Sequence, residues 1–553
     1  MHYLTKSDFL KYLVCPEYLW LIKNKPEIVP VDEGEAIVRR LAQVEEISLL
    51  AKSLFPEGLM ISNTSPDPIE ETRKAMKRNV KTLFNPHILS PEGYLVSSDI
   101  AVYDKEKDVW DLYVVKSENK IKSDNYYDLG FQTLAWESSG YKIRNTVLIH
   151  LNETYKRELV VDPKSIFLFS NLKTAIVENY SDLQKLAEEA ILKVNEIEEP
   201  LGCGCRFLPQ SRHCPTFNYL NKDIPEYSVL NLARIRPDVI TDVVSNIGYD
   251  ISNIPIEKPV YILKSYDGTQ ENYQYGPIEL SRIQRNQVKT YQRKKPMRRK
   301  KDIEEVLEGL EYPLYFLDYE TISTAIPIFK GDHPYKQVPF QYSLHVQEEK
   351  NGPIKHYEFI AEDMHTSPVP QLLKSLSKYI DPNKGTVVVW HASFEKKRNE
   401  EMAMDHTEYA SFLEGINKRV FDLEKIFLDQ KYVSHKFKGK TSIKYVLPAL
   451  VPALSYKGLS IQNGRSATIA WYDAVSGRME EKKAKETLAE LLKYCRLDTL
   501  AMVKVWDYLS PLEAQISEKG RKSKKIKILK DTAKMKKLLD LSQKKEIGDL
   551  EIF

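Results

Sequence analysis

The C-terminal half of the chain alternates between short apolar runs, which predict strands, and segments with the 3.6-residue period of helices. The apolar run that follows Pro313 and ends near Thr321 predicts a buried strand. Residues 338–347 and 354–360 predict two more strands of a meander, and residues 369–379 predict a helix. This order of elements predicts an α/β sheet.

The same alternation continues towards the C-terminus. Residues 386–390 predict a short, fully apolar strand that leads into a helix opened by His391, for which Ser393 is the expected N-cap. Residues 419–423 predict another strand, and residues 488–506 predict a long amphipathic helix. The long helix is expected to pack its apolar face against the sheet.

Charge and apolar clustering divide the 553 residues into four regions, which fits the roughly three to five domains predicted by this length. A basic block at residues 293–301 is interpreted as an interdomain linker, and a second basic block runs from Lys519 to Lys537. Each block is either a solvated segment or a set of phosphate contacts. The predicted regions are an α/β module, a helical connector with the basic linker, a second α/β domain and a basic tail, at residues 1–220, 221–303, 304–510 and 511–553.

Composition limits the classes of protein that fit. No apolar run reaches the roughly 18 residues of a membrane helix, and the start lacks the basic and apolar segments of a secretory signal. We therefore expect a cytoplasmic protein that does not enter a membrane. Lys plus Arg exceeds Asp plus Glu by only 81 to 78, so net charge does not decide about nucleic acid. Five cysteines exclude a disulfide scaffold and favour metal ligands or catalytic groups.

Four carboxylates stand at the ends of different predicted elements. Asp318 and Glu320 are two apart on one strand, so they point to the same face, and Glu395 lies just past another strand end. Asp498 lies one helical turn after Tyr494 and shares its helix face. Such oxygen ligands suit two Mg²⁺ or Mn²⁺ ions, which, about 3.5–4 Å apart, stabilise the attacking and leaving oxygens of a phosphodiester. Taken singly, each carboxylate also fits an ordinary surface position.

The order of these motifs resembles the DEDD exonucleases, which are 3′-to-5′ exonucleases of the RNase H-like (DnaQ) superfamily, in their tyrosine subtype. The resemblance covers about residues 310–510. The wider superfamily usually carries Asp where this chain has Glu395, which is one methylene longer. The motifs that carry the resemblance are Asp318-x-Glu320, the segment from His391 to Glu395, and Tyr494-x-x-x-Asp498.

The segment from Thr441 to Pro452 (TSIKYVLPALVP) narrows the resemblance further. It looks like a bacterial family defined only as a domain of unknown function, in which such an exonuclease follows a RecB-like module. The resemblance implies that Tyr494 orients the attacking water and that four carboxylates ligate two metal ions. Asp422 is expected to have a structural or supporting role, and Cys495 to be a buried helix residue. The implied ligands are Asp318, Glu320, Glu395 and Asp498.

Four of the five cysteines fall at two places in the sequence. Cys15 ends an amphipathic helix at residues 7–15, just before Pro16. The other three lie in a segment whose Gly202 and Gly204 allow the backbone to wrap around a cluster. Four thiolates complete one site for Zn²⁺ or an iron–sulfur cluster, and unrelated buried thiols are the alternative. These cysteines are Cys15, Cys203, Cys205 and Cys214.

One cysteine near the start and three far along the chain resembles the iron–sulfur RecB-type nucleases, including the CRISPR-associated and AddB-like members. Their cluster joins the two ends of the domain. The resemblance implies a [4Fe–4S] cluster, with Zn²⁺ as the alternative. The usual distal spacing in these nucleases is Cys-x₂-Cys-x₅-Cys, whereas this chain has Cys-x-Cys-x₈-Cys.

These nucleases have the PD-(D/E)XK fold, whose signature is an Asp, a strand with Glu-x-Lys and a helix with Gln. Val114 stands where the Glu is required, and residues 45–55 lack the His of active members. Glu118 and Asp111 are substitutes to consider, but Asp111 has the wrong strand parity. We therefore expect a weak or dead site that serves nucleic-acid binding or architecture. The residues of this degenerate site are Asp99, Lys116 and Gln132.

The sequence as a whole predicts a metal-dependent 3′-to-5′ exonuclease that acts on a single-stranded end of DNA or RNA. The degenerate N-terminal module would be its binding platform. A second hypothesis is a nucleic-acid-binding scaffold without catalysis, and a third is that the N-terminal module retains cutting through another carboxylate. Nucleic acid is the expected partner, and a helicase or a repair or defence protein is left open as a further one.

Overall fold

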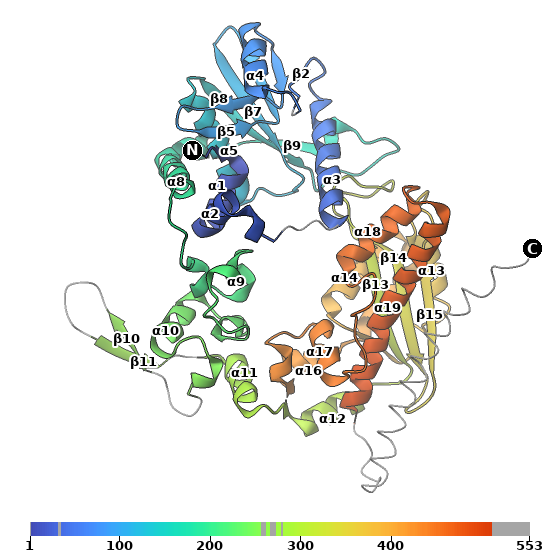
Figure 1. Ribbon diagram of the computed structural model, residues 1–553. Helices are drawn as coiled ribbons and strands as arrows, with labels where there is room; N and C mark the ends of the chain where they lie inside the picture. The colour runs from blue at the N-terminus through green and yellow to red at the C-terminus, as the bar shows by residue number, and fades with distance from the viewer. Residues whose placement is uncertain are drawn as a thin grey trace, which may run out of the picture.

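The computed structural model describes residues 2–30, 35–62, 64–255, 261–265, 273–277 and 280–510. Figure 1 shows an N-terminal and a C-terminal α/β unit joined by a helical connector. The predicted basic tail at 511–553, with its block from Lys519 to Lys537, lies outside the described residues. In the part of the chain that is described, no helix combines the length and apolarity needed to cross a membrane.

The N-terminal unit is built on a six-stranded mixed sheet in the order β2-β3-β6-β7-β8-β9. β7 runs parallel to β8 and antiparallel to β6. A smaller sheet has the order β1-β5-β4. The strands are β1 (Leu4–Thr5), β2 (Leu59–Met60), β3 (Thr82–Phe84), β4 (His87–Leu89), β5 (Tyr94–Ser97), β6 (Ile100–Asp104), β7 (Val109–Val115), β8 (Ile143–Leu151) and β9 (Phe167–Asn171).

Helix α5 (Ser123–Ser138) is the central buried helix of this unit. Its fully buried Trp136 donates from Nε1 to Ser98 Oγ at 3.0 Å. Gly130 lets α8 (Tyr180–Val194) pack closely, since a Cβ there would lie 2.7 Å from Leu183 Cδ1. The other helices of the unit are α1 (Lys6–Val14), α2 (Pro16–Asn24), α3 (Glu35–Lys52), α4 (Pro68–Lys77), α6 (Pro163–Ile166) and α7 (Lys173–Glu178).

The connector contains short helices, as its sequence predicted, and a hairpin. Part of its basic block is attached to the C-terminal unit, because β12 (Met297–Arg298) pairs with β18 (Tyr432–Val433). Arg298 also donates from Nη2 to the carbonyl of Leu509 at 3.0 Å. The elements here are α9 (Phe217–Leu220), α10 (Pro237–Ile247), β10 (Tyr261–Ser265), β11 (Tyr273–Pro277), α11 (Arg282–Arg293) and α12 (Lys300–Glu308).

The C-terminal unit has a five-stranded sheet in the order β15-β14-β13-β16-β17. Its central strand β13 runs antiparallel to β14 and parallel to β16. The predicted strands and helices of this unit are present with ends close to the predicted ones, except that the long helix predicted at 488–506 spans Glu481–Leu509. They are β13 (Leu314–Ile322), β14 (Val338–Gln347), β15 (Ile354–Ile360), α13 (Val369–Leu376), β16 (Thr386–Val389), α14 (Ala392–Asp405) and β17 (Val420–Asp422).

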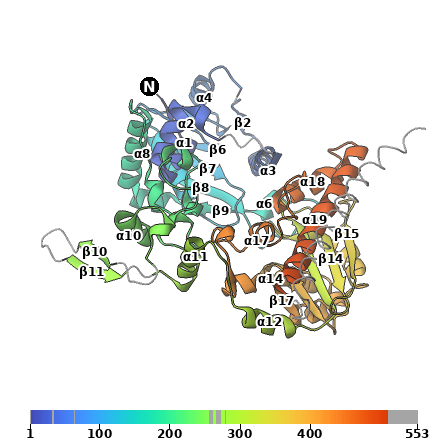
Figure 2. The ribbon, with the colours of Figure 1, turned by 60° about the horizontal axis from the view of Figure 1, so that its bottom comes forward.

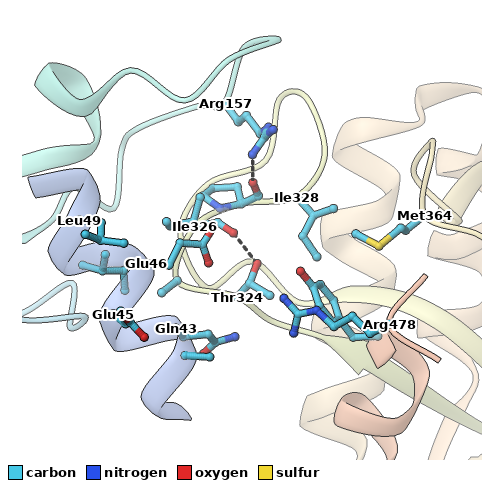
Figure 3. A pocket seen from close by; sticks show the side chains of 15 residues that line it. Gln43, Glu45, Glu46, Leu49, Arg157, Thr324, Ile326, Ile328, Met364 and Arg478 are labelled. Atoms are coloured by element: carbon cyan, nitrogen blue, oxygen red, sulfur yellow. Dashed lines mark hydrogen bonds between the residues drawn. The ribbon is translucent and has the colours of Figure 1, made fainter. Parts of the chain in front are cut away.

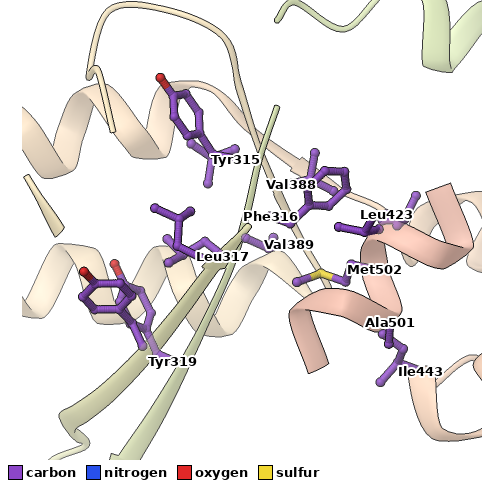
Figure 4. Packing of buried hydrophobic residues seen from close by; sticks show 14 of the residues in the cluster. Tyr315, Phe316, Leu317, Tyr319, Val388, Val389, Leu423, Ile443, Ala501 and Met502 are labelled. Carbon is purple, nitrogen blue, oxygen red and sulfur yellow. The ribbon is translucent and has the colours of Figure 1, made fainter. Parts of the chain in front are cut away.

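Helices cover both faces of this sheet. The face that carries Asp318 and Glu320 is covered by α19 (Glu481–Leu509), the predicted long helix, since Gln341 of the neighbouring strand donates to the Leu491 carbonyl at 2.9 Å. On the opposite face Tyr319 donates to Asn399 of α14 at 3.0 Å. Figure 4 shows the apolar packing around β13. The remaining helices are α15 (Ala410–Lys418), α16 (Lys425–Leu428), α17 (Ile443–Leu450) and α18 (Gly464–Val475).

The loop between β13 and β14 joins the two units. Tyr335 in this loop donates from its hydroxyl to the Ser117 carbonyl of the N-terminal unit at 2.8 Å. In return, Arg157 donates from Nη1 to the Pro327 carbonyl at 2.6 Å. Ala325 is buried in an apolar cluster with N-terminal residues that include Ile47. Figures 1 and 2 both show α3 beside α18, so the units meet along this side.

Candidate functional site

Strand β13 presents two carboxylates on one face, as the alternation of strand side chains predicted. Asp318 pairs across the sheet with Ser343 and Glu320 pairs with Gln341, and the register shifts directly after Glu320. Glu320 is buried, while Asp318 is half-buried. The bulge shifts the pairing of β13 with β14 at Glu320, and the pairing resumes at Thr321 opposite Pro339.

Helix α19 contributes Tyr494, Cys495 and Asp498 to this region. Cys495 donates from Sγ to Asp318 Oδ2 at 3.8 Å, and ligand atoms of Asp318, Glu320 and Cys495 all lie within 4.8 Å of one another. Asp498 accepts a hydrogen bond on Oδ1 from the hydroxyl of Tyr456 at 2.5 Å. Cys495 is fully buried, as the sequence predicted, but it touches the site instead of serving only the apolar packing.

Like Asp498, Glu395 lies outside the compact group of Asp318, Glu320 and Cys495. From the first turn of α14 its charge adds to the effect of burial on the pKa of Asp318 and Glu320. Asp422 fixes where that helix starts. The carboxylate of Asp422 accepts from the backbone N–H groups of His391 and Ala392, each at 3.1 Å. The prediction of Ser393 as N-cap is wrong, because the N-cap is His391, which has a left-handed conformation (φ 74°). The capping carboxylate belongs to Asp422 on strand β17. Asp422 therefore has a structural role, which was one of the two roles expected from the sequence.

The electrostatics of the four carboxylates indicate excess negative charge. Burial and the nearby charge of Asp498 raise the pKa of Asp318 well above its usual range. Burial raises the pKa of Glu320 and Glu395 to about 8, with Asp498 adding to the effect on Glu320. Burial also raises the pKa of Asp498 to about 6. We refer to Asp318, Glu320, Glu395 and Asp498 as the carboxylate site.

The atoms of the carboxylate site are suited to binding a divalent cation. Oε2 of Glu395 is buried and has no hydrogen-bond partner among the described residues. A buried carboxylate oxygen without a donor is costly unless a cation or proton neutralises it. Oxygen donors of this number and charge suit Mg²⁺ or Mn²⁺.

Tyr494 lies beside the carboxylate site as a protonated phenol. Burial and the charge of Asp498 raise its pKa, which keeps its proton at neutral pH. Its hydroxyl is 3.5 Å from Nζ of Lys444, a residue of α17. A protonated Tyr494 suits orientation of a water molecule better than its deprotonation. Sequence reasoning missed Lys444 and Tyr456, although Lys444 lies within a segment that carried the resemblance.

Two adjoining cavities lead away from the carboxylate site. One of about 560 Å³ is lined by Glu320, Phe394 and Arg465. The second, of about 620 Å³, lies between α3 and the loop after β13 (Figure 3) and is lined by Arg157 and Arg478 among other residues. Gln43 and Thr324 line both cavities. Both units of the protein thus contribute walls to the space next to the carboxylates.

The four predicted cysteine ligands meet at a second candidate metal centre. Their Sγ atoms all lie within 4.8 Å of one another, and all four residues are buried. Asn221 donates from Nδ2 to Cys203 Sγ at 3.3 Å, a contact that favours the thiolate, which is the metal-binding form. The four are Cys15, between α1 and α2, Cys203, Cys205 and Cys214.

The residues predicted to form a degenerate N-terminal site take part in ion pairs and hydrogen bonds. Lys116 Nζ lies 2.5 Å from Asp128 Oδ2, and Gln132 donates to Asp128 Oδ1 at 2.7 Å. Burial opposes the charge of Lys6, but the carboxylates of Asp99 and Asp128 outweigh it and raise its pKa. Lysine ammonium groups therefore neutralise the carboxylates that a divalent ion would require.

The substitutes considered for the missing carboxylate do not enter this site. Val114 is fully buried in the core of the unit. Asp111 is engaged by Arg144, whose Nη2 lies 2.5 Å from its Oδ2, and Glu118 pairs with Lys122 at 3.4 Å. Asp99 accepts on Oδ2 from the backbone of Val115 at 2.7 Å. The arrangement offers no third carboxylate beside Asp99 and Asp128 among these residues.

Replacing Lys116 by alanine is expected to lower stability by about 2 kcal/mol, because Asp128 is almost fully buried and loses the cation that hydrogen-bonds to it. Urea unfolding measures this change. An unchanged free energy of unfolding would show that Lys6 alone neutralises Asp128.

Comparison with known proteins gives a family only for part of the chain. Residues 315–442 match the family described as Domain of unknown function (DUF2779), a span that includes Asp318, Glu320 and Glu395. The chain is similar to two uncharacterized mycoplasma proteins, the MG366 homolog of Mycoplasma pneumoniae and MG366 of Mycoplasma genitalium. The first is 27% identical over 217 residues and the second 28% identical over 214 residues. Each match covers 36% of this chain and 32% of the relative, and no solved structure matches.

Proposed function

We propose that this protein is a metal-dependent 3′-to-5′ exonuclease that hydrolyses phosphodiester bonds of DNA or RNA at the carboxylate site. The observation that carries the proposal is the gathering of carboxylates whose pKa values burial raises, together with the partnerless buried Oε2 of Glu395. Such a gathering needs a cation or a proton to neutralise it, and oxygen ligands of this kind suit a divalent cation. The strand order around β13 supports an RNase H-like reading of the C-terminal unit.

The residues of the site have two proposed roles: some would bind the metal ions, and others position these ligands or the attacking water. The four carboxylates would hold two Mg²⁺ or Mn²⁺ ions, which supply Lewis-acid stabilisation of the attacking and leaving oxygens when bound. Asp422 positions Glu395 by fixing the start of α14. Tyr456 restrains Asp498 through its hydroxyl, and Tyr494 presents its phenol to the attacking water. The neighbouring cavities, with Phe394 and Arg465 in their walls, suit bases that stack and phosphates that pair with guanidinium groups.

The test of this proposal is release of mononucleotides from end-labelled single strands in the presence of Mg²⁺ or Mn²⁺. Wild-type protein is expected to shorten matched DNA or RNA oligonucleotides from the 3′ end, and Glu395→Gln to lose this activity. Glu400→Gln, an exposed position on the same helix, is the matched control and should retain it. Equal activity in wild type and Glu395→Gln, or activity in neither, would contradict the proposal and leave a non-catalytic nucleic-acid-binding scaffold.

We further propose that the cysteine centre holds one tetrahedral Zn²⁺ ion in preference to the [4Fe–4S] cluster implied by the sequence resemblance. Four sulfurs about 2.3 Å from one ion lie about 3.8 Å from each other. A cubane cluster places its own iron corners between the thiolates and needs a wider separation. The observed limit of 4.8 Å, with Cys203 and Cys214 sulfurs 4.0 Å apart, favours the single ion.

Protein purified without oxygen is therefore expected to contain one zinc per chain and no iron, and to lack visible charge-transfer absorption. Elemental analysis and an absorbance scan measure this. Iron and inorganic sulfide in near-equal amounts, with a visible band, would restore the iron–sulfur assignment.

A further inference from the structure

Lys444 is held in a fixed position between two tyrosines of the carboxylate site. Its Nζ donates to the Gln462 carbonyl at 2.8 Å and lies 3.5 Å from the Tyr494 hydroxyl. The same ammonium stands over the rings of Tyr456 and Tyr494, 5.5 Å from each centroid. The side chain is half-buried. A backbone acceptor and two ring faces thus restrain a long, normally mobile side chain.

Lys444 is connected to the carboxylates through Tyr456. The ammonium stands over the ring of this tyrosine, whose hydroxyl donates to Asp498 Oδ1 at 2.5 Å. The segment that begins at Gln462, whose carbonyl binds Lys444, also borders the site. A Cβ built on Gly464 would lie 3.5 Å from Glu320 Oε2.

An ammonium group has three N–H donors, and the described contacts engage two of them, at Gln462 and Tyr494. The third remains for a ligand. A phosphodiester positioned for attack beside Tyr494 would bring a non-bridging oxygen to this donor. Lysine binds phosphate as a compact point charge, so it does not need the planar fit that arginine requires.

We propose that Lys444 is a built-in cation of the carboxylate site, which binds a non-bridging oxygen of the scissile phosphate and offsets the charge of Asp498 and Glu320. This inference rests on the proposed function. It predicts two effects of opposite direction, since a fixed cation repels the metal ions but attracts the substrate. Loss of the charge should therefore tighten metal binding and weaken catalysis at the same time.

The experiment compares wild type with Lys444→Met, which keeps the apolar stem and removes the charge. Mn²⁺ binding, followed by electron paramagnetic resonance, is expected to tighten about tenfold in Lys444→Met, in line with one charge at short range. The turnover number on an oligonucleotide is expected to fall about 100-fold, the scale for losing one transition-state donor. Binding of a nucleoside monophosphate in the presence of Mn²⁺ should weaken about tenfold.

Controls separate charge from structure. Lys444→Arg keeps the charge and should keep all three values close to wild type. Lys440→Met removes a nearby cation that stands over Tyr445 and should have no effect. Lys444→Gln gives a second neutral variant in case Lys444→Met does not fold.

The outcomes distinguish this inference from the proposed function. Unchanged or weaker Mn²⁺ binding in a folded Lys444→Met or Lys444→Gln protein overturns the role of Lys444, even if the wild type degrades oligonucleotides. A wild type that binds no Mn²⁺ and cleaves nothing overturns both. Tighter Mn²⁺ binding with weaker nucleotide binding supports the fixed cation, because a merely structural side chain would weaken both.

Discussion

Replacing Asp318 by asparagine is expected to reduce hydrolysis by at least about 1,000-fold while making the metal-free protein more stable. The pKa of Asp318 is raised in the folded protein, so the folded state binds more protons than the unfolded state above the ordinary carboxylate pKa. Stability of the metal-free wild type therefore falls as pH rises from about 4 to about 8, the window bounded by ordinary carboxylates and by Glu320. Asparagine removes one of the repelling charges.

Thermal unfolding at several pH values measures this prediction. The melting temperature of metal-free Asp318→Asn should exceed that of wild type by several degrees at pH 8 and converge with it near pH 4. Added Mn²⁺ should stabilise wild type, by about 2.7 kcal/mol at 100 times its Kd, and the variant much less. Asp507→Asn, at an exposed pair on the same long helix, is the control. A destabilised Asp318→Asn at pH 8 would show that the carboxylates are not in electrostatic conflict.

Replacing Cys203 by serine is expected to abolish the metal binding that we propose for the cysteine centre and to unfold the segment around it. Ion binding to four thiolates contributes on the order of 10 kcal/mol to folding of small structural zinc sites. The centre also ties the start of the chain to a segment far along it, and Trp20 reinforces that junction by donating to the Glu196 carbonyl at 2.9 Å. The four cysteines lie in a buried apolar cluster with Trp20, Phe217 and Leu220, so loss of the ion is expected to loosen that packing as well.

Metal content and limited proteolysis test this second prediction. Cys203→Ser should lose its zinc and become sensitive to cleavage between α8 and α10, with a melting temperature more than about 10 °C lower. Cys495→Ala, which changes a buried cysteine outside the centre, should keep its zinc. Full resistance to protease in metal-free Cys203→Ser would show that the segment folds by apolar packing alone.

Much of the C-terminal unit follows from its sequence. The strands β13 and β14 are continuous apolar or alternating runs, and the carboxylates Asp318 and Glu320 sit where strand parity puts them. The position of Glu395 is also predictable, because it lies in the first turn of the helix that follows the apolar strand β16. These features depend on neighbours in the sequence, and local patterns encode them.

Features that depend on distant residues were not predictable. The cap of α14 comes from Asp422 on a different strand, so the local sequence suggested Ser393 instead. Lys444 has the pattern of an ordinary helix-surface lysine, and only the tertiary structure brings Tyr494 beside it. Likewise, the role of Lys6 follows from the approach of Asp99 and Asp128, which lie in other elements. Pairing between remote charged groups leaves no periodic signal in the sequence.

The contact between the two units through the loop after β13 has a consequence for how the protein can be divided. Tyr335 and Arg157 bind backbone carbonyls of the opposite unit, and Ala325 completes an apolar cluster that neither unit closes alone. A fragment cut out at residue 304 would expose this cluster to solvent and invite aggregation. Expression, truncation and chimera experiments should therefore keep the two units together in one polypeptide.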